Sequence, residues 1–469
     1  MTRETWATRL GFILAAVGSA VGLGNVWRFP WMTAQNGGSA FLLVYLAIVL
    51  LVGVPGLLGE FVIGRRAKRN PVGALRDLSG SRGWALAGAL GVATATILLS
   101  FYSVVGGWIL RYFLESLYGF VGTAPYAGRP GAHFSAVSFG PEAAVFHLVF
   151  LALTAAIVVS GVRRGIEVGT KVMMPAIVVL LAALAVWAGT QEGALAGYAF
   201  FLSFDAATLR ANWLDLLAPA AGQALFTLSI GAGTMLVYAS YLGEDRSLPV
   251  DATTIAILNT GVGVLAGLVV FPLLFSIGVE PGSGGPGALF VSLAGAFSSL
   301  PGGEFIGTLF FGVVLLAALS SSISILEIPV AFVVDEFDQS RRTAVAAVST
   351  VIGLGGIANA LRSSLFSFIA GQVVNTLLTL GLLLFLLFVG WQLGPAAVDE
   401  FRKGASATTA RLATTWRYFV GTVLPVFLAV TLLTGVGLDG TIGRWPVVAI
   451  AVAVTVVAAA VFSRSRTTA

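Results

Sequence analysis

Gly18-Ser19-Ala20-Val21-Gly22-Leu23-Gly24-Asn25 interrupts an apolar run that extends from Leu10 to Gln35. A second interruption by small residues, Ser229-Ile230-Gly231-Ala232-Gly233, lies within the apolar run from Pro219 to Leu242. In a membrane, unwound backbone is tolerated only where protein buries it or where it lines a cavity. Interrupted helices at corresponding places in two halves of a chain indicate the binding site of a secondary transporter. The two stretches therefore predict both the fold and the position of its site.

The composition is that of a polytopic membrane protein. Mean hydropathy is +0.96, and 57% of the 469 residues are hydrophobic whereas 10% are charged, which excludes an ordinary soluble fold. The chain has no cysteine and two histidines, so disulfides, thiol catalysis and Cys- or His-rich metal sites are excluded. Twelve apolar stretches are near or above the ~20 residues that a membrane helix needs: 9–35, 38–64, 84–118, 142–161, 166–188, 212–241, 250–278, 304–335, 341–360, 363–393, 412–436 and 444–463.

Basic residues predict the orientation of these twelve spans. With the N-terminus in the cytoplasm, twenty of the 26 lysines and arginines fall on the cytoplasmic side and Arg28 falls within the membrane. The remaining five fall outside: Arg111, Arg129, Arg210, Arg362 and Arg444. This asymmetry predicts a multi-pass plasma-membrane protein with both termini in the cytoplasm. The basic run 65–69 is then a topology signal, and no nucleic-acid partner is expected.

A helix that stops and restarts inside the membrane can bind both a cation and an anion. Carbonyls near Gly18, Ala20 and Val21 lack helical partners and attract a cation, whereas the N–H groups of Leu23 and Gly24 attract a carboxylate. Arg28 is the only charged side chain in 10–35, and the stretches 219–243 and 305–326 have none. A cation there would be held by neutral oxygens, which suits a monovalent alkali ion better than a divalent metal. Side-chain candidates are Asn25, Asn259, Thr227, Ser320 and Ser321, although a serine or threonine can also bond to its own helix.

A series of motifs resembles the neurotransmitter:sodium symporter family, and within it the prokaryotic amino-acid transporters. The motifs occur in order from about residue 3 to about residue 395: Trp6-Ala7-Thr8-Arg9, Gly22-Leu23-Gly24-Asn25-Val26-Trp27-Arg28-Phe29-Pro30, Gln35-Asn36-Gly37-Gly38-Ser39-Ala40-Phe41, Gly59-Glu60-Phe61, Phe101-Tyr102-Ser103-Val104-Val105, Gly222-Gln223-Ala224-Leu225-Phe226-Thr227-Leu228-Ser229, Gly284-Gly285-Pro286-Gly287, Ala317-Ala318-Leu319-Ser320-Ser321-Ser322 and Val389-Gly390-Trp391.

The resemblance implies an all-α membrane fold in one transporter domain, residues 1–469. Spans one to five (9–188) and six to ten (212–393) would form inverted repeats with unwound helices 1 and 6, followed by two additional helices (412–463). It also implies sodium-coupled import of a small substrate by alternating access. The expected substrate is a neutral, hydrophobic or aromatic L-amino acid, because Gly22 stands where the family's monoamine carriers place an aspartate. Ala232 replaces a bulkier aromatic of the leucine-type members, which favours a larger substrate side chain.

The resemblance assigns residues to two sodium sites and one substrate site. One sodium site would be formed by Ala20, Asn25, Thr227 and Asn259. The other would be formed by Gly18, Val21, Ala317, Ser320 and Ser321. The expected substrate pocket comprises Ser19, Ala20, Gly22, Leu23, Gly24, Leu98, Tyr102, Val105, Phe226, Thr227, Ser229, Ala232, Ser321 and Ile325, with the Tyr102 hydroxyl and the Leu23 and Gly24 amides on the carboxylate.

The resemblance also assigns residues to two gates. At two positions this chain departs from the family. Arg3, Trp6, Ser240, Tyr241 and Asp335 match a cytoplasmic gate in which Arg3 pairs with Asp335. Arg28 matches an outer gate whose usual acidic partner is replaced by Ala370, so we expect a looser gate with Gln372 accepting from Arg28 through water. Chloride dependence is left open, because Tyr45, Gln223 and Thr227 match chloride positions whereas Gly263 does not. Glu60 is expected to bond backbone near the first span's break, and Glu327 is assigned a similar structural role.

Other classes of function fit the sequence less well. Two alternatives are kept: a sensor that binds sodium and an amino acid without turnover, and a symporter of a GABA-like zwitterion. The paired breaks disfavour a channel, and no nucleophile–base pair, metal cluster or phosphate loop indicates an enzyme. The scarcity of acids in the core disfavours proton coupling. The sequence leaves open the substrate's identity, the sodium stoichiometry and the oligomeric state.

Overall fold

The computed structural model describes residues 5–279, 287–299, 302–435 and 437–464, and within them every regular element is helical. Nine of these helices are long and apolar enough to cross a membrane, and a bent pair, Arg9–Ala20 with Gly24–Gln35, makes a tenth span. The two other expected spans correspond to the broken helix over 206–240 and to the C-terminal helix. The all-helical membrane fold is therefore confirmed, and each of the twelve expected spans corresponds to a helix or a broken helix. Arg3 and the motif residues 284–286 lie outside the described residues.

The first five spans contain a break or a π-helical turn in three places. Span one is α1 (Arg9–Ala20), η1 (Gly24–Arg28) and α2 (Phe29–Gln35). Span two is α3 (Ser39–Ile48), η2 (Val49–Gly53) and α4 (Val54–Ala67), and span three is α6 (Arg82–Tyr118). Spans four and five are α8 (Pro141–Val158) and η3 (Val162–Ile166) with α9 (Glu167–Gly189).

The second five spans begin with the other broken helix. Span six is α11 (Ala206–Thr227) and α12 (Thr234–Ser240). It is followed by α13 (Leu248–Ser276), α15 (Gly303–Phe337) and α16 (Arg341–Leu361). Span ten is α17 (Ser363–Phe368), η5 (Ile369–Val373), α18 (Val374–Leu387) and η6 (Phe388–Leu393).

Short helices connect the spans, and two more spans end the chain. The connectors are α5 (Pro71–Ser79), α7 (Pro130–Val137), α10 (Ala194–Leu202), α14 (Ala288–Ser299), α19 (Pro395–Arg402) and α20 (Ala407–Ala410). The last spans are α21 (Ala413–Gly421) with α22 (Val423–Gly435), and α24 (Arg444–Arg464) after the short α23 (Leu438–Ile442). Among these connectors, α14 packs on α7 and α15.

Both helix breaks have local causes in the backbone. After α1, Val21 is extended (φ −79°, ψ 96°), which ends the helix. After α11, Ser229, Gly231 and Gly233 have positive φ of 53°, 100° and 85°, a region that glycine occupies without the steric cost that a side chain adds. Gly231 also packs so closely on α18 that a Cβ there would lie 2.1 Å from the Leu378 carbonyl oxygen.

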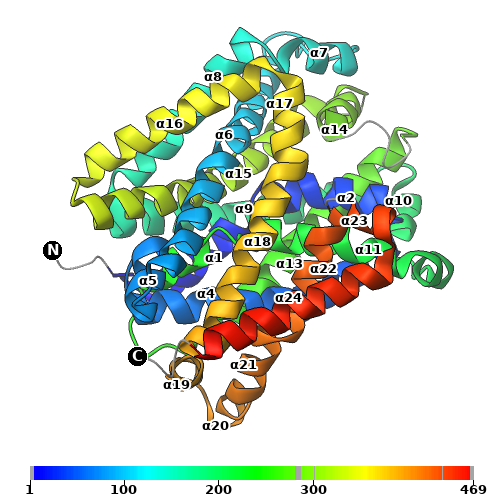
Figure 1. Ribbon diagram of the computed structural model, residues 1–469. Helices are drawn as coiled ribbons and strands as arrows, with labels where there is room; N and C mark the ends of the chain where they lie inside the picture. The colour runs from blue at the N-terminus through cyan, green and yellow to red at the C-terminus, as the bar shows by residue number, and fades with distance from the viewer. Residues whose placement is uncertain (1–4, 280–286, 300–301, 436, 465–469) are drawn as a thin grey trace.

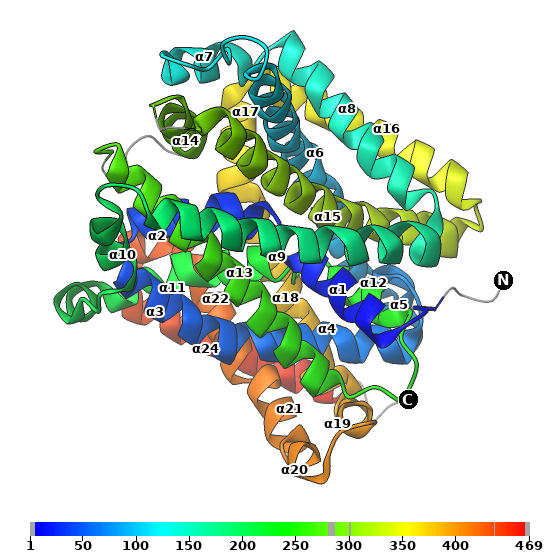
Figure 2. The ribbon, with the colours of Figure 1, turned by 180° about the vertical axis from the view of Figure 1, so that it is seen from behind.

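The broken helices lie at the centre of the molecule (Figure 1). There α18 passes close to the break between α11 and α12, and α6 and α15 pack along each other on the other side. In the opposite view α1 lies beside α9, and the start of α1 and the end of α24 lie toward the same side of the molecule (Figure 2). Large apolar side chains such as Leu86, Val179 and Leu354 are exposed on the outside, where lipid rather than water would surround them.

Candidate functional site

The two unwound stretches are joined to each other and to α15 by hydrogen bonds at one carbonyl. The Ser229 hydroxyl donates to the carbonyl oxygen of Ser19 at 2.9 Å, and the Ser321 hydroxyl donates to the same oxygen at 2.9 Å. Segments some 210 and 302 residues apart in sequence therefore meet at the end of α1. The pairing of the breaks, which the sequence predicted, is confirmed.

A small cavity lies between the breaks. Ten predicted pocket residues line it, together with Thr234 and Leu378, which were not predicted: Ser19, Ala20, Gly24, Leu98, Tyr102, Phe226, Ser229, Ala232, Ser321 and Ile325. Its volume is about 20 Å³, which is room for about one water molecule. This conformation is therefore closed around its centre, and the side chains must move apart to admit an organic ligand. Of the other predicted residues, Val105 and Thr227 are buried but do not line the cavity.

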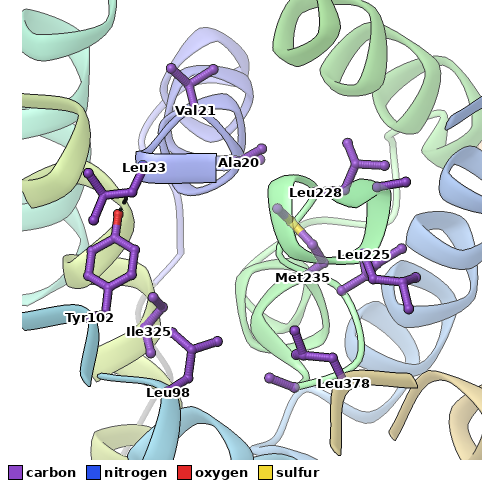
Figure 3. Packing of buried hydrophobic residues seen from close by; sticks show 14 of the residues in the cluster. Ala20, Val21, Leu23, Leu98, Tyr102, Leu225, Leu228, Met235, Ile325 and Leu378 are labelled. Atoms are coloured by element: carbon purple, nitrogen blue, oxygen red, sulfur yellow. Dashed lines mark hydrogen bonds between the residues drawn. The ribbon is translucent and has the colours of Figure 1, made fainter. Parts of the chain in front are cut away.

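Tyr102 connects α6 to the first break. Its hydroxyl accepts a hydrogen bond of 3.3 Å from the Leu23 backbone N–H, and its side chain points toward Leu23 (Figure 3). Leu98 and Ile325 lie beside it. Gly22 does not line the cavity but packs against its wall, because a Cβ at that position would lie 2.9 Å from the Tyr102 hydroxyl. The phenol of α6 and a backbone N–H of the first break thus bond to each other at this point.

A first oxygen cluster (Asn25, Thr227 and Asn259) lies next to the cavity. The Asn25 amide donates to the Asn259 carbonyl oxygen at 2.8 Å and to its side-chain oxygen at 2.9 Å. The Thr227 hydroxyl donates to Asn25 Oδ1 at 2.9 Å. All three residues are buried, and Ala20, the fourth predicted ligand, ends α1 and lines the cavity. Neutral oxygens from three helices therefore converge where the resemblance predicts a cation.

A second oxygen cluster (Gly18, Val21, Ala317, Ser320 and Ser321) lies between α1 and α15. The Ser320 hydroxyl lies 3.1 Å from the Val21 carbonyl oxygen and 2.9 Å from that of Ala317. The Ser321 hydroxyl lies 3.5 Å from the Gly18 carbonyl oxygen. Ser320 thus bonds both to its own helix and to the break, so the local and the ligating interpretations of this serine are not exclusive. Again the predicted residues meet.

Glu60 stabilises the second break, not the first. One carboxylate oxygen accepts from the Gly231 N–H at 2.6 Å, and the other accepts from the N–H groups of Met235 and Leu236, each at 3.1 Å. Met235 and Leu236 lie in the first turn of α12, where N–H groups lack helical partners and a negative charge is favoured, and Gly231 lies in the break before it. The structural role was predicted correctly, but the expectation that Glu60 bonds near the first break is wrong. The sequence places Glu60 on span two without showing which break that span faces.

Arg28 is buried above the cavity, with 9% of its surface exposed. Its Nη2 donates to Asn375 Oδ1 at 3.0 Å and its Nη1 to the Gly222 carbonyl oxygen at 3.4 Å, while its guanidinium lies 4.6 Å from the centre of the Phe226 ring. Sequence reasoning missed Asn375. Asn375 contacts Arg28 directly, and Gln372, which was expected to accept from Arg28 through water, lines the same cavity as Arg28. The signal was a second amide in an apolar stretch, three residues after Gln372 and five residues after Ala370.

A larger cavity of about 670 Å³ opens on the other side of Phe226; we call it the vestibule. Ala370 and Gln372 line it, so the position expected for a gate acid does face this space. Phe226 lines both the vestibule and the central cavity. Phe226 and the guanidinium over it therefore form the partition between the two.

The opposite side of the site is closed by the segment before α1. The Trp6 indole N–H donates to the Tyr238 carbonyl oxygen at 2.9 Å, and the Trp6 ring packs edge-on against Tyr241. Tyr241 donates to Glu327 at 2.8 Å, and Arg341 pairs with the same carboxylate. Glu327 thus joins two helices, as its predicted structural role requires, and Trp6 and Tyr241 lie together as predicted.

The other two residues predicted for this gate, Asp335 and Ser240, each form a hydrogen bond with a different partner. Asp335 accepts from the Asn70 backbone N–H at 2.8 Å, and the Ser240 hydroxyl bonds to the Val237 carbonyl oxygen of its own helix at 2.5 Å. The predicted pairing of Arg3 with Asp335 lies outside the described residues. Asp335 therefore joins α15 to the start of α5 whatever its relation to Arg3.

The positions that match a chloride site are only partly equipped for an anion. The Gln223 amide donates to the Gly24 carbonyl oxygen at 2.7 Å, and Tyr45 is buried nearby. A Cβ at Gly263 would lie 3.5 Å from Asn25 Nδ2. Gly263 thus faces the first oxygen cluster but supplies neither hydroxyl nor charge.

Comparison with known proteins identifies the family. A family model described as the sodium:neurotransmitter symporter family matches residues 3–124 and 139–460. The chain belongs to the sodium:neurotransmitter symporter family. A sodium-dependent transporter of Bacillus subtilis, YhdH, is 35% identical over 446 residues, with 92% of this chain and 98% of the relative covered. A sodium-dependent transporter of Methanocaldococcus jannaschii is 33% identical over 459 residues, with 91% and 89% covered.

A solved structure has the same fold. The crystal structure of MhsT in complex with L-phenylalanine matches with a TM-score of 0.83 and 38% sequence identity, covering 92% of this chain and 100% of that one. The protein is thus a multi-pass membrane transporter of the prokaryotic branch of the sodium:neurotransmitter symporters, with an inverted-repeat fold and sodium dependence as a family property. Membership in a transporter family also argues against an enzyme.

Proposed function

We propose that the protein is a sodium-coupled importer of a neutral, hydrophobic or aromatic L-amino acid. The observation that carries the proposal is the contact between Tyr102 and the Leu23 N–H at the break in span one. In the bound state a carboxylate takes the place of that contact, accepting from the phenol and from the Leu23 and Gly24 amides. Helix N-termini favour anions in this way. The substrate's ammonium group faces carbonyls at the opposite end of the break and the Ser229 hydroxyl.

Two sodium ions fit the two oxygen clusters. Asn25, Thr227 and Asn259 with the Ala20 carbonyl offer neutral oxygens to one ion, beside the point where the carboxylate binds. Ser320 and Ser321 with the Gly18, Val21 and Ala317 carbonyls offer oxygens to the other. Because an ion and a carboxylate attract each other strongly in a buried site, each increases the affinity of the other, and this reciprocity couples their transport.

The apolar wall favours a hydrophobic side chain. Leu98, Ala232, Ile325 and Leu378 face the central cavity, and none of them carries a polar group that would recognise a polar substrate. Ala232 leaves the most space among them. A related transporter with 38% identity was solved with L-phenylalanine, which supports an aromatic or large aliphatic substrate for this chain too.

The closed and open sides of the site suggest how access alternates. The Trp6 and Tyr241 side, together with Asp335, acts as the cytoplasmic gate, and the Arg28 side faces the outside. Residues 9–188 and 212–393 act as the two inverted repeats, and 412–463 as additional helices. The distribution of basic residues supports an orientation with both termini in the cytoplasm.

Equilibrium binding to purified transporter tests the substrate class. Radiolabelled L-phenylalanine, L-tryptophan, L-leucine, L-alanine, glycine and GABA are compared in sodium chloride and in potassium chloride. We expect saturable binding of one of the first three that requires sodium. Preferential binding of GABA would instead support a carrier of a longer zwitterion, and equal binding in both salts would contradict the assignment of the oxygen clusters to sodium.

A further inference from the structure

We propose that Asn375 is the positioning residue of the outer gate, a neutral amide that holds Arg28 over Phe226 where no carboxylate is present. The inference rests on the proposed function, because it assigns the vestibule to the outer side. Among the described residues, no aspartate or glutamate lies within salt-bridge distance of Arg28, and the sequence has no acid between residues 363 and 398. The guanidinium therefore depends on neutral acceptors.

The amide of Asn375 is oriented by its own helix. Its Nδ2 donates to the Gly371 carbonyl oxygen at 2.7 Å, one turn earlier in η5. Because the nitrogen is occupied in this way, the oxygen is the atom that faces Arg28, at 3.0 Å. A bond between a neutral acceptor and a guanidinium is stronger than one between two neutral groups, but it lacks the attraction between opposite full charges. The resulting gate is held closed by this bond, but less strongly than a gate closed by an ion pair.

Asn375 also lies where the gate and the substrate site communicate. Leu378, almost one turn further along α18, lines the central cavity, and its carbonyl oxygen packs against Gly231 in the second break. Asn375 itself lines the vestibule. A movement of α18 that accompanies substrate binding at Leu378 would therefore shift the acceptor of Arg28. Through α18, substrate binding in the central cavity would affect Asn375, the residue that holds Arg28 in the partition.

The absence of cysteine from the chain gives a direct test. A single cysteine replaces Ala232 in the central cavity, and a membrane-impermeant methanethiosulfonate reagent is added from the vestibule side. In this background Asn375→Ala should raise the modification rate about 10-fold, whereas Asn375→Asp should lower it, because it converts a neutral contact into an ion pair. Thr376→Val, a matched change at a neighbouring residue that lines the vestibule, should leave the rate within about twofold of the parent.

Opposite shifts for alanine and aspartate would separate gating from packing, since a residue with a merely structural role would give similar effects for both. Equal rates for Asn375→Ala, Asn375→Asp and Thr376→Val would overturn the inference. Each variant is also tested for sodium-dependent amino-acid binding. Failure of that binding in the wild-type protein, which keeps Ala232, would refute the proposed function, whereas normal wild-type binding with unshifted modification rates would refute only the role of Asn375.

Discussion

Gly22 and Ser321 are in such close contact that a Cβ at position 22 would lie 2.0 Å from the Ser321 hydroxyl oxygen. The contact joins the break in span one to α15 at the second oxygen cluster. It leaves no room for an aspartate at position 22, so the glycine that indicated an amino-acid substrate from the sequence also has a packing reason. The substrate site and the ion site share this contact.

Replacing Gly22 by alanine should therefore impair sodium and substrate binding together. The methyl group must displace Ser321 or Tyr102, and overpacking of a tight site costs about 1–3 kcal/mol. We expect a loss of about 5- to 150-fold in the affinity of sodium-dependent amino-acid binding, measured at equilibrium. Gly261→Ala is the matched control, because a Cβ there meets nothing within 4 Å; a normal affinity in Gly22→Ala would show that the site is looser than described.

The serines of α15 should differ in their effect on sodium. Ser320→Ala removes a hydroxyl of the second oxygen cluster and should raise the sodium concentration for half-maximal binding by about 10-fold, the size expected for one lost ligand. Ser322→Ala is the control, since its hydroxyl bonds to Leu319 and Thr154 instead. Sodium titrations of amino-acid binding measure both. If the two variants need the same sodium concentration, the second cluster is not an ion site.

Tyr102→Phe should weaken amino-acid binding without changing the sodium sites. A hydrogen bond to a charged group contributes about 1.5–3 kcal/mol, so the dissociation constant should rise about 10- to 100-fold at saturating sodium. Competition with the amino-acid amide, which has no carboxylate, identifies the interaction. The amide should discriminate little between wild type and variant, and a Tyr102→Phe protein that binds the free amino acid normally would exclude the phenol from carboxylate recognition.

Glu60→Gln should destabilise the fold around the second break. Two carboxylate oxygens accept three N–H bonds, and an amide retains only one acceptor atom and places an N–H against a donor. We expect a lower melting temperature in detergent, corresponding to about 2–4 kcal/mol. Glu192→Gln, at an exposed residue, should melt like wild type. Similar melting of both variants would indicate that α12 is held by other contacts.

Ala232→Phe should shift the selectivity toward small substrates. Ala232 is 3% exposed and lines the central cavity, so an added ring occupies space that a large substrate side chain would take. We expect the affinity for tryptophan or phenylalanine to fall at least about 10-fold relative to that for alanine, measured by competition. A parallel change for all substrates would place Ala232 outside the specificity pocket.

The small residues in spans one and six predicted the two breaks, because a chain that unwinds at mid-depth needs residues that allow positive φ and close backbone packing, as at Gly231. Gly18, Val21, Ser320 and Ser321 meet as expected. The sequence does not show which neighbouring helix each face of a span packs against. Glu60 lies at the second break because span two passes α12, and that packing is a tertiary relationship that no local pattern records.

The outer side was predicted less completely. Alignment to Ala370 revealed a missing acid, but a motif position cannot show that a side chain five residues later reaches the same guanidinium. Asn375 does so because η5 inserts a wider turn before it and because its amide is fixed by Gly371. The size of the pocket was also beyond the sequence, since Ala232 indicated space whereas the cavity of this conformation is nearly filled.

Uptake into proteoliposomes tests the central claim most directly. Vesicles with purified transporter are given radiolabelled L-phenylalanine, L-tryptophan or L-leucine with an inward sodium gradient, with equal sodium on both sides, or with potassium instead. The account predicts accumulation above the external concentration of at least one of these amino acids, only with the gradient. Sodium-dependent binding without accumulation would contradict it and make the protein a sensor rather than a symporter.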